Sequence, residues 1–216
     1  GLGTTDAQGN TLNGSTAGDS FSGTDAENNT LIGKDAGTAI TTGDENVAVG
    51  ALALDANTTA SSNTAIGYQS LTSNTTGASN TGIGRRALFN NTTANNNTAV
   101  GQNSLVANTT GAANTAVGVN ALDANTTASS NAAFGYASLT ANTTATNNSA
   151  FGANTLETNT TGANNTAVGS SALYANTTGT ENVAVGSNAL DANTTGSYGT
   201  AVGYQAGSAH TTGASL

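Results

Sequence analysis

Apolar and polar residues follow one another along this chain in a pattern that repeats every 17 residues. The repeating unit reads N-T-A-V-G-x-x-A-L-x-A-N-T-T-G-x-x, and no insertion interrupts it between residues 29 and 215. A fixed period indicates a repeat architecture, in which each unit buries its apolar residues against its neighbours. We therefore expect residues 29–216 to form a solenoid of eleven repeats, preceded by an irregular N-terminal coil or coils in residues 1–28.

The short period favours strands over helices. A repeat built from two helices needs about 34 residues, twice the length of this unit. The T-A-V segment is flanked by Asn and Gly, which favours a short strand followed by a turn. The Asn-Thr-Thr-Gly segment would end any helix that began at Ala-Leu. The predicted fold is all-β, a parallel β-solenoid of about eleven to twelve coils stacked about 4.8 Å apart.

Positions are counted here from the asparagine that opens each repeat. Large apolar residues at the fourth and ninth positions predict two interior columns. The fourth-position column contains Val49, Ile66, Ile83, Val100, Val117, Phe134, Phe151, Val168 and Val185. The ninth-position column contains Leu54, Leu71, Leu88, Leu105, Leu122, Leu139, Leu156, Leu173 and Leu190.

The third position is nearly always small. If the fourth position points inward, strand alternation turns the third position outward. The third-position residues would then form an apolar surface column suited to association with other copies of the chain. This column contains Ala65, Ala99, Ala116, Ala133, Ala150, Ala167, Ala184 and Ala201.

Glycine occupies the fifth position of every repeat. An invariant Gly predicts a bend with positive φ, or a backbone approach too close for a Cβ atom. The predicted bend glycines are Gly50, Gly67, Gly84, Gly101, Gly118, Gly135, Gly152, Gly169 and Gly186.

The Asn-Thr-Thr segment allows three interpretations. Stacked asparagines can form a ladder of amide hydrogen bonds. The same triplet satisfies the N-x-[ST] pattern for glycan attachment, and ranked threonines could order water on an ice-binding or ligand-binding face. The asparagines concerned are Asn57, Asn74, Asn91, Asn108, Asn125, Asn142, Asn159, Asn176 and Asn193.

The composition excludes several classes of function. The formal net charge is −9, with three Lys plus Arg, so the chain lacks the clustered cations that bind nucleic acid or an anionic membrane surface. There is no cysteine, and Asp does not recur in every coil as it does in calcium-binding solenoids. We predict no cofactor, no metal and no enzyme, because catalysis needs a constellation that interrupts the repeat. Arg85 and Arg86 form a cationic pair in otherwise neutral columns, and we expect either an exposed pair on a variable turn or a contact to a carboxylate of a neighbouring chain or a ligand.

The segments N-T-A-V-G and N-T-A-I-G, at Asn63–Gly67, Asn114–Gly118 and Asn165–Gly169, resemble the repeats of YadA-like head domains of trimeric autotransporter adhesins. The longer segment N-T-A-I-G-Y-Q-S-L at Asn63–Leu71 is also similar to repeats of bacteriophage tail fibres and bacterial surface proteins. The resemblance implies a left-handed β-roll, a homotrimer and attachment to a surface receptor, glycan or matrix. The Asn-Thr-Thr arm is an enlargement relative to that family.

We therefore expect a non-enzymatic, extracellular fibre domain at a cell surface or on a virion, with a structural and adhesive role and homotrimeric assembly. Two alternatives stay open at this point. One is an ice-binding solenoid with ranked Thr and Asn, and the other is a self-assembling extracellular filament subunit.

Overall fold

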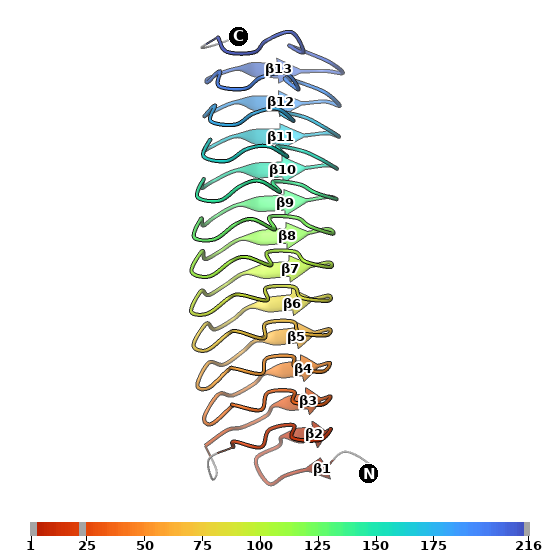
Figure 1. The fold of residues 1–216 in the computed structure, drawn as a ribbon, viewed down its shortest axis with the longest axis vertical. Coiled ribbons are helices and arrows are strands. Elements are labelled where there is room, and N and C mark those ends of the chain that lie inside the picture. Colours follow the sequence, from red (N-terminus) through yellow and green to blue (C-terminus); the bar gives the residue numbers. More distant parts are fainter. Residues whose placement is uncertain (1–3, 22–24, 214–216) are drawn as a thin grey trace. The chain divides into compact units, whose positions relative to one another are not determined.

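The computed structural model describes residues 4–21 and 25–213, and the chain divides into two compact units, Gly1–Thr110 and Gly111–Leu216. Each unit is a parallel β-solenoid in which one short strand per coil stacks on the strand of the next coil (Figure 1). The predicted all-β class and the 17-residue coil are confirmed within each unit.

Unit 1 begins with an antiparallel pair and continues in parallel. Strand β1 pairs with β2 in the antiparallel sense, and each strand from β2 to β6 pairs in parallel with its successor. The offset between paired residues is 19 from Thr11 to Thr30 and 17 from Thr30 to Val47. The strands are β1 (Thr4–Thr5), β2 (Thr11–Asn13), β3 (Thr30–Ile32), β4 (Val47–Val49), β5 (Thr64–Ile66), β6 (Thr81–Ile83) and β7 (Thr98–Val100).

Unit 2 has the regular arrangement throughout its described strands. Each strand pairs in parallel with its successor, and paired residues are 17 apart, as in Thr115↔Ala132 and Val183↔Thr200. Equal positions of the repeat therefore lie side by side. The strands are β8 (Thr115–Val117), β9 (Ala132–Phe134), β10 (Ser149–Phe151), β11 (Thr166–Val168), β12 (Val183–Val185) and β13 (Thr200–Val202).

The fifth-position glycines satisfy both reasons for which a Gly was predicted there. Gly118 has φ +140°, and a Cβ atom on it would lie 2.2 Å from the carbonyl oxygen of Gly135. Gly50 has φ +136°, and its Cβ would lie 2.6 Å from the oxygen of Gly67. An L side chain is therefore excluded by conformation and by contact with rigid backbone. The glycine ends the strand and turns the chain sharply in every coil.

Three further positions of the repeat have positive φ without being glycine. At the seventh position Asn103 has φ 57°, at the ninth Leu105 has φ 50°, and at the seventeenth Asn96 has φ 61°. The left-handed conformation costs an ordinary residue about 1–2 kcal/mol, and Asn tolerates it better than most. The abundance of Asn at the seventh and seventeenth positions follows from these turns. The ninth-position leucines adopt the same conformation because their burial offsets its cost.

Of the two predicted interior columns, the structure places only the leucine column inside. Every leucine from Leu54 to Leu190 in this column is fully buried, whereas Ile66 and Val168 are 37 % and 38 % exposed. The third-position alanines are buried instead, so the predicted outward column of alanines is wrong. The fourth-position residues that the prediction wrongly placed inside are Val49, Ile66, Ile83, Val100, Val117, Phe134, Phe151, Val168 and Val185.

The physical reason for this reversal is the narrow interior of the coil. A Cβ atom built on Gly82, at the third position, would lie 2.6 Å from Ser70 Oγ and 3.4 Å from Leu71 Cγ. The leucine therefore already fills the space opposite the strand, and only a small residue fits there. Strand alternation then forces the second and fourth positions outward.

The first coils reverse the sizes of the same two positions. Leu31 stands at the third position, where most later coils have Ala, and Gly37 stands at the ninth, where the next nine coils have Leu, from Leu54 to Leu190. Leu31 is fully buried, and a Cβ on Gly37 would lie 2.8 Å from its Cδ2 atom. Leu12 and Gly18 repeat the exchange one coil earlier, with Leu12 Cδ2 3.1 Å from a Cβ on Gly18. In these coils the third-position and ninth-position side chains together keep roughly the volume of the Ala and Leu that replace them later, as close packing requires.

Candidate functional surface

The asparagines of the Asn-Thr-Thr segment lie inside the coil and not on a face. In unit 1 the Nδ2 group of Asn74 donates to Asn57 Oδ1 at 3.1 Å and to the carbonyl of Gly77 at 2.8 Å. The same two bonds recur in unit 2, where Asn159 donates to Asn142 Oδ1 at 3.2 Å and to Gly162 at 2.9 Å. These bonds satisfy polar groups that the corner would otherwise bury without partners.

This burial overturns the prediction of a glycan, ice or ligand face on these residues. A glycan needs an exposed amide, and an ice or ligand face needs accessible side chains. The nine asparagines are all fully buried: Asn57, Asn74, Asn91, Asn108, Asn125, Asn142, Asn159, Asn176 and Asn193. The ladder interpretation of the segment is the correct one for the described bonds.

A second asparagine ladder runs along the first position of the repeat. Asn46 donates from its backbone N–H to Asn29 Oδ1 at 2.9 Å, and its Nδ2 group donates to the same oxygen at 3.1 Å. It also donates to the carbonyl of Ala60 at 3.0 Å. In unit 2, Asn165 makes the equivalent bonds to Asn148 and Gly179. The two ladders together hold the Asn-Thr-Thr corner of each coil.

The threonines of that corner differ in availability. The Thr58 hydroxyl donates to the carbonyl of Thr75 at 3.2 Å, and Thr177 donates to Thr194 at 3.0 Å in the same way. The next residues, Thr59 and Thr178, are exposed. The hydroxyl of the first threonine is therefore hydrogen-bonded to the backbone of the next coil, and the second threonine is the more exposed of the two. The Thr-Thr pair does not form two parallel columns of equally accessible hydroxyl groups.

The strands present columns of partly exposed apolar residues on the surface of each unit. We call the outward side chains of the second and fourth positions the strand face. In unit 1 it consists of Thr30, Ile32, Val47, Val49, Thr64, Ile66, Thr81, Ile83, Thr98 and Val100. In unit 2 it consists of Thr115, Val117, Ala132, Phe134, Ser149, Phe151, Thr166, Val168, Val183, Val185, Thr200 and Val202.

The strand face is charge-free, and its large residues are partly open to solvent. Ile83 is 37 % exposed, Phe151 is 41 % exposed and Val202 is 69 % exposed. The rings of Phe134 and Phe151 stack on one another, with centroids 4.9 Å apart and planes 9° from parallel. Sequence reasoning missed this face because it assigned the fourth position to the core. The size exchange between Leu31 and Gly37 was the signal that could have revealed it.

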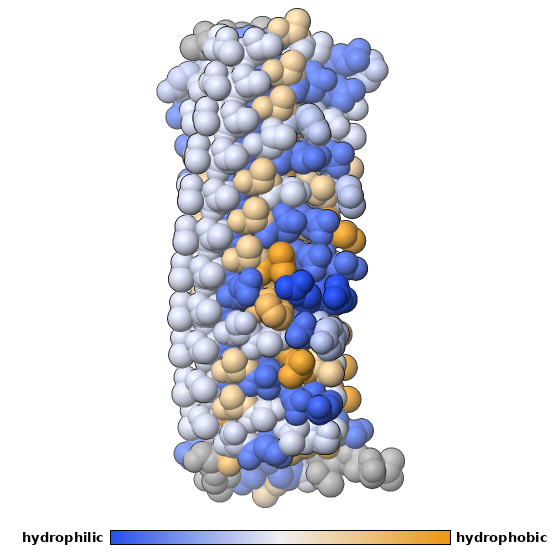
Figure 2. Space-filling model, in the orientation of Figure 1, coloured by the Kyte–Doolittle hydropathy of each residue, from blue (hydrophilic) through white to orange (hydrophobic). Residues whose placement is uncertain are grey.

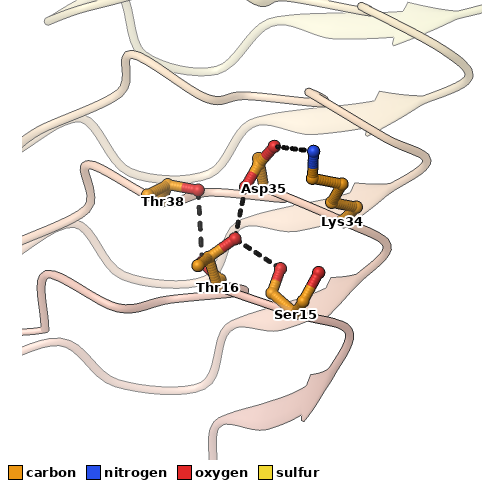
Figure 3. Close-up of polar contacts among 5 residues, drawn as sticks. All are labelled: Ser15, Thr16, Lys34, Asp35 and Thr38. Carbon is orange, nitrogen blue, oxygen red and sulfur yellow. Dashed lines mark hydrogen bonds and ion pairs between the residues drawn. The ribbon is translucent and has the colours of Figure 1, made fainter.

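Charged side chains gather outside the strand face. Lys34 and Asp35 form an ion pair with a 3.6 Å separation, and the Thr16 hydroxyl donates to the Asp35 carboxylate (Figure 3). The Thr38 hydroxyl donates to the carbonyl of Thr16 at 3.2 Å. These bonds link neighbouring coils of unit 1. No group of three or more His, Cys, Asp or Glu residues that could hold a metal ion occurs among the residues described.

Three carboxyl groups have displaced pKa values. Hydrogen bonding by Asn10 lowers the pKa of Asp6. Burial raises the pKa of Asp55, and hydrogen bonding from Thr38 partly opposes this effect. Burial likewise raises the pKa of Asp123. The negative charge of Asp35 adds to the rise in the pKa of Asp55.

The cation pair predicted to be an exposed turn or a carboxylate contact lies beside aromatic residues. The guanidinium of Arg86 lies over the ring of Phe89, 4.5 Å from its centroid. Arg85 is exposed on the same coil, and Tyr68 on the preceding coil is 48 % exposed. Figure 2 shows strongly hydrophilic and strongly hydrophobic surface next to each other at the level that β6 has in Figure 1.

His210 ends one of the ladders in unit 2. It occupies the position of the ladder asparagine in the last coil, and its Nε2 atom lies 2.8 Å from the carbonyl oxygen of Gly213. Asn193 Oδ1 in the preceding coil is buried and has no hydrogen-bond partner in the described part of the chain. His210 is therefore a variation at the end of the ladder.

Comparison of the chain with protein-family models, with curated proteins and with solved structures finds no match. Among the described residues, no helix has the length and apolar character needed to cross a membrane.

Proposed function

We propose that this chain is a non-enzymatic, extracellular fibre domain with a structural and adhesive role, whose copies associate side by side through the strand face. The observation that carries the proposal is the charge-free apolar strand face, which repeats in register along each unit. Water-exposed columns of Val, Ile and Phe are uncommon on a surface meant for solvent, and a large apolar patch usually marks an interface.

The number of copies comes from the resemblance to YadA-like head repeats, which implies three. Closed cyclic symmetry buries one equivalent face on every copy, so a trimer would cover all strand faces at once. This interface replaces the alanine column on which the sequence-based expectation of association depended. The fibre would then present its remaining side chains to a receptor, glycan or matrix.

The test is the mass of the native particle, measured by sedimentation equilibrium or native mass spectrometry. The expected result is a particle of three 20.8 kDa chains. The double variant Ile66→Glu with Ile83→Glu should dissociate it, because burying uncompensated carboxylates costs far more than the apolar contact returns. The matched control is Thr76→Glu with Thr93→Glu, which adds the same charge to exposed positions of the same coils. A monomeric parent chain would contradict the proposal.

A second candidate, ice binding, is supported by a specific feature of the same face. Thr64 and Ile66 illustrate it: they point to the same side of the strand two residues apart, and the parallel register aligns them with Thr81 and Ile83. Two parallel ranks of Thr and Val or Ile thus lie on one sheet surface. Ice binding requires this face to be open, so a monomer with thermal hysteresis would favour it over the fibre. Long filaments in electron micrographs would instead favour a self-assembling subunit.

A further inference from the structure

The three cationic residues of the chain differ in how their charges are used. All three lie in unit 1 at the sixth or seventh position of a coil: Lys34, Arg85 and Arg86. Lys34 is paired with Asp35 at 3.6 Å. Neither arginine forms an ion pair within the part of the chain that the structure describes, and no Asp or Glu occurs anywhere between residues 56 and 122. Two positive charges therefore stand uncompensated on a protein of net charge −9.

Backbone hydrogen bonds join the two arginines to the coils before and after them. The N–H of Arg86 donates to the carbonyl of Tyr68 at 3.0 Å, and the N–H of Asn103 donates to the carbonyl of Arg85 at 3.0 Å. Three consecutive coils thus stack Tyr68, Arg85 and Gln102 in one sixth-position column, and all three side chains are exposed. The column offers an aromatic ring, a guanidinium and an amide at successive steps of about 4.8 Å.

The guanidinium of Arg86 is held in place by the ring of Phe89. Arg86 lies 4.5 Å from the centroid of Phe89, within the range of a cation–π contact. Such a contact uses the flat face of the guanidinium and leaves the N–H donors in its plane available. Arginine donors of this kind bind a carboxylate through two parallel hydrogen bonds.

We propose that Tyr68, Arg85 and Arg86 form a binding site for the carboxylate of an acidic sugar, such as a uronic or sialic acid residue of a surface glycan. The guanidinium groups bind the carboxylate. The exposed ring of Tyr68 packs against the C–H face of the sugar, and Gln102 supplies an amide for its hydroxyl groups. A sugar matches this column better than an acidic peptide, because an aromatic ring and an amide flank the cationic pair.

This inference rests on the proposed adhesive function and gives that function a ligand class. The site does not use the strand face, since the bend at Gly84 separates Ile83 from Arg85. Binding of a sugar and association of copies can therefore be measured independently.

The test is calorimetric titration of the full chain with two probes, trigalacturonic acid and 3′-sialyllactose. Their uncharged counterparts, the methyl ester of trigalacturonic acid and lactose, serve as ligand controls. Arg85→Gln and Arg86→Gln should each weaken binding of the acidic probe by about tenfold or more, the loss typical of a hydrogen bond to a charged group. Lys34→Gln is the matched protein control, because it removes the same charge from the same position of an earlier coil and should leave affinity unchanged within about twofold.

The circular dichroism and particle mass of each variant show whether the fold and the assembly are intact. Selective loss in the two arginine variants, with both properties unchanged, supports the site. The site is overturned if neither acidic probe binds, if the uncharged counterparts bind equally well, or if Lys34→Gln causes the same loss. Binding of hexaglutamate as tight as that of the sugars would overturn the assignment to a saccharide. None of these results alters the particle mass, so failure of the site remains distinct from failure of the fibre proposal.

Discussion

The asparagine ladders and the strand face reverse the usual relation between hydropathy and burial. The ladder residues Asn74 and Asn159 are fully buried, whereas Ile83 and Phe151 on the strand face are 37 % and 41 % exposed. In the ladders, each buried amide has donors and acceptors within reach on the adjacent coil, so its desolvation is compensated. On the strand, an interior that the ninth-position leucine already fills leaves room only for a small residue at the third position. The comparison shows what decides which residues a thin solenoid buries: whether their polar groups find hydrogen-bond partners, and whether their side chains fit the width of the coil interior.

The largest expected effect comes from making one ladder position apolar. Asn159→Leu removes the bonds to Asn142 Oδ1 and Gly162 O, and it removes one of the two acceptors of Asn176 Nδ2, which also donates to Gly179. We expect a loss of about 3–6 kcal/mol in the free energy of unfolding, because three hydrogen bonds worth about 0.5–1.5 kcal/mol each are lost and the buried Asn142 Oδ1 loses its donor, at a cost of about 1–3 kcal/mol. Urea denaturation followed by circular dichroism measures this change.

The reverse substitution on the strand face is the matched control. Val168→Asn places a polar residue at an exposed position of the same unit, and we expect a change within about 1 kcal/mol for the isolated chain. If Asn159→Leu stabilised the chain, hydropathy and not hydrogen bonding would determine burial at the corner, and the comparison would be wrong.

An intermediate effect on stability is expected from truncating one leucine side chain of the interior column. Leu122→Ala should cost about 2–5 kcal/mol, the range for truncation of a buried leucine, because the rigid turns on either side prevent the coil from closing over the cavity. Val117→Ala, on the strand face of the same coil, should cost less than about 1 kcal/mol. Thermal and urea unfolding of the two variants measures the difference. Equal losses would mean that the two columns share the core after all.

The smallest effect concerns Asp123, next to that leucine. Burial raises the pKa of its carboxyl above the ordinary value of 3.8, so the folded chain disfavours the charged form. The resulting loss of stability is absent below pH 3.8 and develops as the pH rises through the raised pKa. Asp123→Asn should therefore stabilise the chain at pH 7 by no more than about 0.5 kcal/mol. The gain should vanish near pH 3, and a gain independent of pH would show that ionisation is not its cause.

Several features of the fold could be predicted from particular residues. The period of Asn and Gly implies coils of equal length, and the T-A-V segment implies one short strand in each. The fifth-position glycines were predicted to need positive φ or close backbone approach, and Gly118 shows both. The leucine column was predicted to be interior, and Leu122 is fully buried. These features depend on interactions among neighbouring residues, and the same residue types recur in successive repeats.

The functional surfaces depended on information that the repeat does not contain. A strand of three residues has no pattern long enough to show which side is inward, since Thr-Ala-Val can bury either its centre or its two ends. The Asn-Thr-Thr triplet fits an exposed glycan site and a buried ladder equally well by composition. The choice between them depends on where the corner places each amide, which is a property of the closed coil.

The sequence by itself determined the period, the parallel stacking and the residues at which the chain must bend, because turn chemistry and strand propensity act over a few neighbouring residues. Only the tertiary structure decided which columns face inward. The ninth-position leucine fills most of the narrow interior of the closed coil, so the strand on the opposite side can place only a small residue such as alanine inside. The valine, isoleucine and phenylalanine side chains of the strand therefore lie on the surface. The tertiary structure also brings Tyr68 beside Arg86 across 18 residues of sequence, through a backbone hydrogen bond that exists only once the coils have stacked.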